Sequence, residues 1–184
     1  MATVELKGAS ALSKQLDKIG NADLRKCILQ LTMKMQGQAK LLAPVSGIVS
    51  GAGELRDSIR VRVEERDGYL IGTCYTNKEY AIYVEMGTGP KGQENHAGIA
   101  PGVPVAYTPE PWWVHEGPGE NEVSRETGEG YHWFYIDTPQ GRFYRVDGQP
   151  AQPYMYPAYK AVEEQAPGFI SAYLSAEFAK AGAK

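Results

Sequence analysis

The chain has 184 residues, of which 42% are hydrophobic and 22% charged, a composition typical of a single globular domain and unlike that of a disordered chain. No apolar run approaches the roughly 18–20 residues that a membrane-spanning helix needs, and the first residues lack the features of a signal peptide, so we expect folding in a reducing cytoplasm. The net charge of −3 argues against a protein that coats nucleic acid, and Cys27 and Cys74 are too few for a disulfide framework.

Charge and aromatic residues are unevenly distributed along the chain. Residues 1–70 carry 11 basic and 8 acidic side chains, a net charge of +3, whereas residues 88–150 carry four basic and nine acidic side chains, a net charge of −5. Twelve of the 19 aromatic residues lie between Tyr107 and Tyr159. The middle of the chain is therefore both acidic and aromatic, unlike either flank.

The N-terminal part predicts two helices. Residues 10–19 have apolar side chains at helical spacing, and Gly20 follows as the expected end of this first helix. Asn21 or Asp23 can cap a second helix over about residues 22–43, which Pro44 ends. The apolar stripe of that second helix consists of Leu24, Ile28, Leu31, Met35, Ala39 and Leu42.

A β-hairpin is expected next, after a glycine-rich loop. Residues 59–64 alternate apolar and charged side chains, which is typical of a half-buried strand. Asp67-Gly68 is a strong turn signal, and residues 69–76 form the return strand. Residues 80–86 have apolar side chains at i, i+3 and i+4, which favours a short helix over a strand.

The remainder of the chain predicts loop, hairpin and helix. Residues 87–130 show no period and many Gly and Pro, so we expect a loop. Residues 131–136 and 142–146 resemble the strands of a hairpin, and residues 158–179 a final helix with a kink at Pro167. The sequence thus predicts an α+β fold: one domain over 1–184, with the long N-terminal helix and the C-terminal helix packed on a small antiparallel sheet and an aromatic-rich insertion over 89–147.

Catalytic and cofactor sites find little support in the sequence. His96, His115 and His132 lie far apart, in no metal-ligand spacing, and the glycine-rich stretches lack the spacing of a phosphate-binding loop. No cofactor is expected, and the protein is expected not to be an enzyme. The carboxylates and tryptophans of 110–133 could form a sugar-cleaving cleft, but an acidic solvated loop is the favoured interpretation.

Four stretches in a fixed order carry a family resemblance. They are AKLLAPV at 39–45, GELRDSI at 53–59, TNKEYAIYVEMGTG at 76–89 and GQPAQPYMYPA at 148–158. Together they resemble the tail-completion, or head–tail joining, family of long-tailed bacteriophages. The chain departs from that pattern in a longer stretch between Pro44 and Arg56, and in Tyr154 and Tyr156, where the family has Phe and Arg. The segment 90–147 is longer than in the family, so the resemblance implies no role for it.

The resemblance implies a structural virion protein at the head–tail junction, made and assembled in the host cytoplasm. It implies a ring, six copies around the DNA channel, that contacts head connector or adaptor proteins and the tail terminator or tail tube protein. DNA would pass without sequence-specific binding, and no membrane is involved. The motif positions expected to shape the fold are Pro44, Gly53, Leu55, Arg56, Tyr80, Glu85, Gly87, Pro153 and Pro157. Of these, Glu85 is expected to be partly buried and paired with Arg56 or Arg60.

Two hypotheses concern the insertion. Its aromatic side chains are expected to anchor on a neighbouring subunit or on the tail terminator, as buried aromatics do in protein interfaces. These are Trp112, Trp113, Trp133, Phe134, Tyr135, Phe143 and Tyr144. Its carboxylates are expected to face the DNA channel or solvent, so that repulsion lets DNA slide. These are Glu110, Glu116, Glu120, Glu122, Glu126 and Glu129.

Two rival functions stay open on the sequence alone. One is an aromatic-lined carbohydrate-binding module or glycosidase that acts at the host surface, which binding to a glycan panel would support. The other is a nucleic-acid-binding adaptor, which predicts an affinity for DNA that falls steeply with salt.

Overall fold

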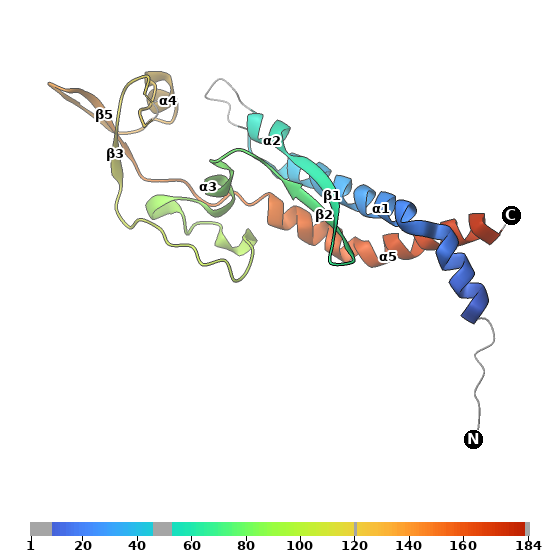
Figure 1. Cartoon of the computed structure of the whole chain (residues 1–184). Helices are drawn as coiled ribbons and strands as arrows, with labels where there is room; N and C mark the ends of the chain where they lie inside the picture. The colour runs from blue at the N-terminus through green and yellow to red at the C-terminus, as the bar shows by residue number, and fades with distance from the viewer. Residues whose placement is uncertain (1–8, 46–52, 120, 183–184) are drawn as a thin grey trace.

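The computed structural model describes residues 9–45, 53–119 and 121–182, with side chains within residues 24–180 of these ranges. Figure 1 shows an elongated molecule in which α1 begins and α5 ends at one end and a small sheet lies at the other. We call residues 89–147 the lobe and the remaining described residues the body. Helices and strands are both present, in two small antiparallel sheets, so the predicted α+β fold is confirmed.

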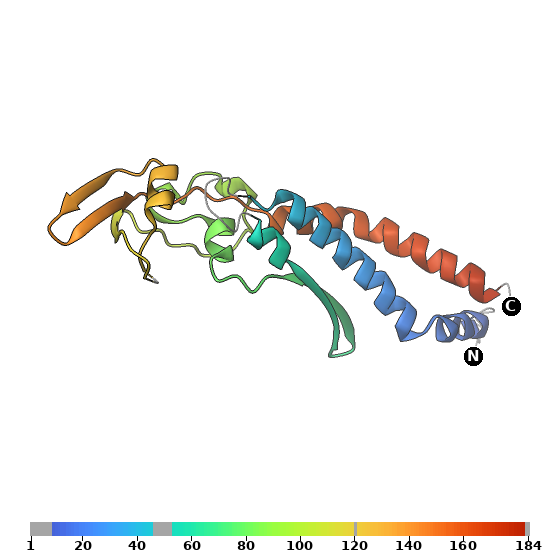
Figure 2. The same ribbon diagram turned by 90° about the horizontal axis from the view of Figure 1, so that it is seen from above.

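The body contains four helices and the two strands of a hairpin. Helix α1 spans Ala9–Leu42, α2 Glu54–Ser58, α3 Ala81–Met86 and α5 Met155–Gly182, while strands β1 (Arg60–Arg66) and β2 (Tyr69–Tyr75) form a hairpin. The long α1 and α5 run antiparallel along each other, and the hairpin packs against α1 (Figure 2). Helix α1 therefore lies in the middle, in contact with both the hairpin and α5.

Helix α1 is continuous where the sequence predicts two helices. Gly20 does not end a helix, and neither Asn21 nor Asp23 caps one, because all three lie inside α1. A glycine inside a helix costs only about 1 kcal/mol relative to alanine, which neighbouring turns can offset. Figure 1 shows the dark-blue N-terminal end of α1 bent away from the rest of the helix.

The hairpin agrees with its prediction. Arg60 pairs with Tyr75 and Arg66 with Tyr69, in an unbroken antiparallel register. Asp67 (φ 53°) and Gly68 (φ 78°) both have left-handed backbone conformations, as the tight turn requires. Gly72 lets β2 approach α1 closely, since a Cβ atom there would lie 2.0 Å from Oγ1 of Thr32.

The core lies where α1, α2, α3 and the first turns of α5 meet. Ile59 and Tyr154 are its largest fully buried members in this cluster, and Cys74 packs against it from β2. Cys27 is buried on α1 and Cys74 is half-buried, so both cysteines pack as small hydrophobic side chains. The buried cluster comprises Ala39, Ala43, Leu55, Ile59, Ala81, Tyr154 and Ala158, all of which belong to the body.

Helix α5 begins earlier and is less interrupted than the sequence suggests. It starts at Met155, not at residue 158, and continues through Pro167 to Gly182. Its long contact with α1 supports the turn in which Pro167 removes a backbone hydrogen bond. Within the described residues, no helix is long and apolar enough to cross a membrane.

The lobe contains the second sheet. Strands β3 (Trp112–His115), β5 (Gly141–Val146) and β4 (Tyr135–Thr138) are antiparallel in that order, and α4 spans Arg125–Gly130. The β4–β5 hairpin is confirmed, although β4 begins four residues later than predicted and β5 one residue earlier. The expectation of a loop over 87–130 is wrong at β3 and α4, because elements of four and six residues are too short to show a period.

Candidate interaction surface

Glu85 organises the junction from which the lobe emerges. This buried side chain of α3 accepts hydrogen bonds from the backbone N–H groups of Tyr154 (2.8 Å), Met155 (2.9 Å) and Tyr156 (3.0 Å). The next residue, Pro157, has no N–H to satisfy. Glu85 thus satisfies the three N–H groups that the first turn of α5 leaves without a helical partner, and Pro157 takes the place of the fourth donor. The carboxylate also meets the positive end of the helix dipole.

The prediction that Glu85 is buried is confirmed, but the prediction that it pairs with Arg56 or Arg60 is wrong. Arg56 lies on the surface, with its Nε 3.9 Å from Asp57, and Arg60 donates to the backbone carbonyl of Asp57. A helix N-terminus replaces the arginine because it offers several donors at once to a carboxylate that has left water.

The chain enters and leaves the lobe at one crossing. Thr88 and Gln149 exchange two backbone hydrogen bonds, of 2.9 and 3.1 Å. Gly87 (φ 81°) allows this approach, since a Cβ atom there would lie 2.7 Å from the backbone nitrogen of Ala151. The motifs at 76–89 and 148–158, some sixty residues apart in the sequence, are therefore in direct contact, and together they fix the stem of the lobe.

The remaining motif positions all belong to the body. Leu55 is buried in the core, and Gly53 (φ 95°) precedes α2 in a left-handed conformation. Tyr80 precedes α3 and is exposed, while Pro153 lies against Gly98. Pro44 follows the end of α1, and the turn expected between it and Gly53 falls largely on residues 46–52, outside the described residues.

One face of the lobe sheet is covered. Tyr144 is fully buried there against α4, where a Cβ atom on Gly128 would lie 2.4 Å from its ring. Tyr135 and Trp133 contact the same ring edge-on, at centroid distances of 6.0 and 6.4 Å. Tyr144 is thus the buried centre of the lobe, and Trp133 and Tyr135, which is itself 45% exposed, pack around its ring.

A network of polar side chains surrounds Tyr144 and Tyr135 on the covered face of the lobe sheet. Glu116 accepts hydrogen bonds from Arg125 (2.8 Å) and from the hydroxyl of Tyr144 (3.0 Å). Arg142 pairs with Asp137 (2.8 Å) and lies over the ring of Tyr135, 3.9 Å from its centroid. The hydrogen bond from Arg125 is the main cause that lowers the pKa of Glu116.

The opposite face of this sheet is open. The pairing register places Trp113 beside Arg145 in one row of side chains. Phe134 extends this row, because its carbonyl accepts a hydrogen bond from the N–H of Arg145. The next row on the same face consists of His115, Phe143 and Ile136. Phe134 is 64% exposed, Trp113 46% and Ile136 40%. We call Trp113, Phe134, Ile136 and Phe143 the open face. Its two most exposed rings meet edge-on at 6.1 Å.

His115 borders the open face and links it to the loop before α4. Its Nδ1 lies 2.7 Å from the carboxylate of Glu122, and its Nε2 lies 3.1 Å from the carbonyl oxygen of Gln140. Both partners only accept hydrogen bonds, so the protonated imidazolium satisfies both contacts. Accordingly the hydrogen bond to Glu122 raises the pKa of His115, and that from His115 lowers the pKa of Glu122.

The seven aromatic residues singled out from the sequence therefore divide into three groups. Trp113, Phe134 and Phe143 belong to the open face, while Trp133 and Tyr135 pack around the buried Tyr144. Trp112 packs on the crossing, because a Cβ atom on Gly89 would lie 2.7 Å from its ring. Alternation along each strand separates them, and the sequence alone did not give the register needed to see it.

The six carboxylates divide as well. Glu110 and Glu126 are exposed. Glu129 lies 3.6 Å from Arg142, and Glu116 and Glu122 belong to the interactions described above. Glu120 lies outside the described residues.

Sequence reasoning missed a groove on the body. Arg25, Lys26 and Leu29 of α1 and Val63 of β1 line a hollow of about 400 Å³. Arg25 donates a hydrogen bond to the carbonyl of Val63 at this site. Leu29 (38% exposed) and Met33 (54%) lie off the apolar stripe of α1, and this departure from the helical pattern was the available signal.

Among the described residues, no three His, Cys, Asp or Glu side chains gather as a metal site would require. The comparison with curated proteins found no match, and neither did the comparison with solved structures. One family model matches, described as "Bacteriophage HK97-gp10, putative tail-component", over residues 6–87. The match covers α1, the hairpin and α3, and ends where the lobe begins. The resemblance to a tail family of long-tailed phages is thereby confirmed, over the part of the body that residues 6–87 form.

Proposed function

We propose that this chain is a structural virion protein that joins the head connector to the tail of a long-tailed phage, as a ring of six copies around the DNA channel. The observation that carries the proposal is the match of residues 6–87 to a phage tail-component family. The position at the joint, the ring and its copy number extend that match on the strength of the ordered motifs at 39–45, 53–59, 76–89 and 148–158.

The arrangement of the lobe supports a role in assembly. Its stem is fixed by backbone hydrogen bonds and by Glu85, and it presents aromatic side chains on a small rigid sheet. Exposed aromatic residues on a rigid support are suited to binding another protein, since little conformational entropy is lost on contact. The open face is the part of the lobe that we assign to subunit or neck contacts.

The exposed carboxylates support passage of DNA. Glu110 and Glu126 are exposed, and the segment 88–150 carries a net charge of −5. A wall of this charge repels phosphates and lets DNA slide, whereas a basic wall would hold it. We assign the channel role to Glu110 and Glu126, because Glu116 and Glu122 are engaged within the lobe.

The test is electron microscopy of lysates from a phage that lacks this gene. We expect filled heads beside separate tails of normal length, and complementation with the wild-type chain should restore joined particles. A Trp113→Ala/Phe134→Ala chain should fail to restore them, whereas a Tyr69→Ala chain, altered at an exposed residue of the hairpin, should succeed. Joined particles in the absence of the gene would refute the proposal.

The carbohydrate-binding alternative has one observation in its favour, the exposed Trp113 and Phe134, which could stack on sugar rings. Its glycosidase form needs a carboxylic acid with a raised pKa, and the pKa values of Glu116 and Glu122 are both lowered. Joined but poorly infectious particles from the deletion, together with binding of the purified chain to a glycan panel, would favour this alternative.

A further inference from the structure

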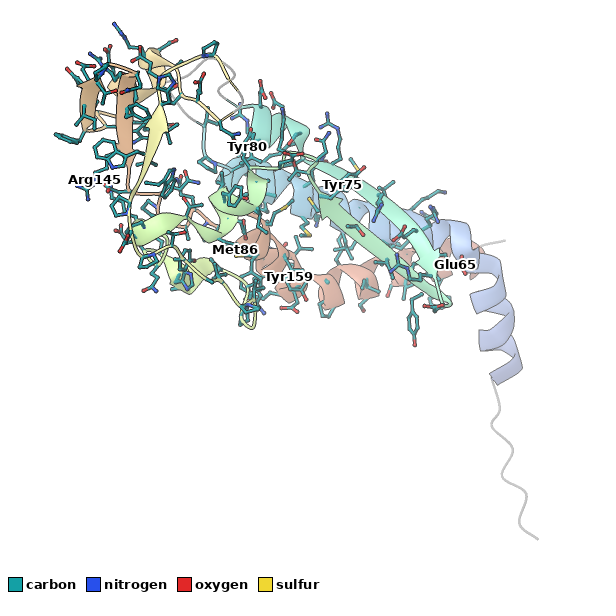
Figure 3. All side chains as sticks on the ribbon, turned by 60° about the vertical axis from the view of Figure 1, so that its left-hand side comes forward. Glu65, Tyr75, Tyr80, Met86, Arg145 and Tyr159 are labelled. Carbon is teal, nitrogen blue, oxygen red and sulfur yellow. The ribbon has the colours of Figure 1, made fainter. Side chains whose placement is uncertain are left out.

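Two unlike apolar surfaces lie on different parts of the molecule. The open face belongs to the lobe, and the groove of Arg25, Lys26, Leu29 and Val63 belongs to the body. In Figure 3, Arg145 of the lobe sheet and Glu65, two residues beyond Val63 on β1, are at opposite ends of the structure. An open face therefore reaches a groove only when the two belong to different copies.

The chemistry of the two surfaces is complementary. Leu29 and Val63 give the groove an apolar lining, and two cationic residues belong to its walls. Such a site suits an aromatic ring, which packs on the aliphatic side chains and receives a cation on its face. The chain already uses this contact internally, with Arg142 over Tyr135 at 3.9 Å and Lys34 over Phe169 at 4.3 Å. Trp113 and Phe134 are the exposed rings of the open face.

Net charge favours the same pairing. The segment that bears the open face carries −5 over residues 88–150, and the segment that bears the groove carries +3 over residues 1–70. Opposite net charges attract before contact and orient the two partners, whereas lobe against lobe, or body against body, would bring like charges together. Arg145 lies in the same row as Trp113 and Phe134 but is paired with Asp147 (3.2 Å), so the net charge still favours a head-to-tail contact over a symmetric one.

We infer that the open face of one copy docks into the α1–β1 groove of a second copy of this chain, with Phe134 and Trp113 as the inserted side chains. Each copy then offers one open face and one groove. Contacts of this type repeat from copy to copy and form a closed ring when the rotation per copy divides the full turn. The inference rests on the proposed function for the ring and adds the pair of surfaces that builds it.

Disulfide trapping tests the contact in assembled particles. A Leu29→Cys/Phe134→Cys chain complements the deletion phage, and joined particles are oxidised and separated on a non-reducing gel. We expect a ladder of covalent oligomers. The matched control is Leu29→Cys/Tyr69→Cys, which keeps the groove cysteine and moves the other to the hairpin; it should remain monomeric. Joined particles whose Leu29→Cys/Phe134→Cys chain stays monomeric would overturn the inference and leave the proposed function standing.

If the Leu29→Cys/Phe134→Cys chain does not join heads to tails, oxidation of purified chains tests the contact between the open face and the groove. A Leu29→Cys chain is mixed with a Phe134→Cys chain under oxidising conditions, and each is also oxidised alone. A covalent heterodimer that forms in the mixture and is lost after Arg25→Glu/Lys26→Glu substitution in the groove chain supports the contact. Oxidation that yields no heterodimer, or as much with Tyr69→Cys as with Phe134→Cys, overturns it.

Discussion

Glu85 belongs to α3 but stabilises α5, seventy residues later in the chain. Its burial could be predicted, since a glutamate among apolar residues beside a glycine suggests a structural corner. Its partner could not, because a helix N-terminus leaves no charged residue in the sequence to mark it. The same limit applied to Thr88 and Gln149, whose contact consists mainly of backbone hydrogen bonds.

Replacement of Glu85 tests this corner. Glu85→Ala leaves three buried N–H groups without an acceptor and should lower the free energy of unfolding by about 3 kcal/mol, because charge-assisted hydrogen bonds are lost together with a favourable helix-dipole contact. Urea denaturation followed by circular dichroism measures it. Glu79→Ala, at an exposed position, is the control and should change the value by less than about 0.5 kcal/mol.

The interaction of His115 with Glu122 makes the stability of the lobe depend on pH. The raised pKa of His115 means that its contribution to stability is complete below about pH 6.5 and is lost as the pH rises through the pKa of the folded state. The lowered pKa of Glu122 means that its contribution is present above about pH 4.3 and is lost as the pH falls through its folded value. The pair is therefore strongest in mildly acidic solution.

NMR titration of the histidine ring protons tests this pair. We expect His115 to titrate above the usual value for histidine, and Glu122→Gln to return its pKa towards that value by removing the carboxylate. Glu126→Gln, at an exposed position of the same lobe, is the control and should leave the pKa of His115 raised. An unchanged His115 pKa in the Glu122→Gln chain would contradict the assignment.

Elements with long or regular patterns were predictable, and short ones were not. The β1–β2 hairpin, α3 and most of α1 follow from alternation, helical spacing and the Asp67-Gly68 turn. Strand β3 and helix α4 could not be predicted, because β3 is stabilised by pairing with β5 and α4 by packing on Tyr144. The sequence predicted the aromatic residues of the candidate surface. It could not predict which of them lie on the covered face and which on the open face, because that depends on the register of the lobe sheet.

The contact between the hairpin and α1 depends on a single missing side chain. Gly72→Ala places a Cβ atom 2.0 Å from Oγ1 of Thr32, so β2 must move away from the helix, at a cost of about 1–3 kcal/mol. Gly37→Ala is the matched control, since a Cβ atom there meets nothing within 4 Å and alanine favours a helix by about 1 kcal/mol. Thermal unfolding should show the two variants shifted in opposite directions.

At the scale of the whole molecule, the buried core and the lobe are separate. The core cluster that includes Ile59 and Tyr154 contains no residue of 89–147, and the two ends of the lobe are hydrogen-bonded neighbours. Composition and the family motifs predict a division of the chain into one domain and an insertion over 89–147. The elongated arrangement could not, because it depends on the direction in which the stem leaves the body.

Removal of the lobe tests this separation. A chain in which Asn-Gly replaces residues 89–148, so that it joins Thr88 to Gln149, should fold into a body that unfolds cooperatively and keeps the helical circular-dichroism signal of α1 and α5. The same chain should fail to restore joined particles to the deletion phage. Tyr154→Ala, which empties a site in the core, should destabilise both the full chain and the shortened one by about 3–5 kcal/mol.

The crossing of Thr88 and Gln149 also bears on how such a protein changes over evolutionary time. A segment whose two ends meet can be lengthened, shortened or exchanged with little effect on the surrounding fold, because the entropy of closing it grows only slowly with its length. Recombination at this point would replace one lobe by another in a single event. A lineage can thus acquire a new lobe while it inherits the body unchanged.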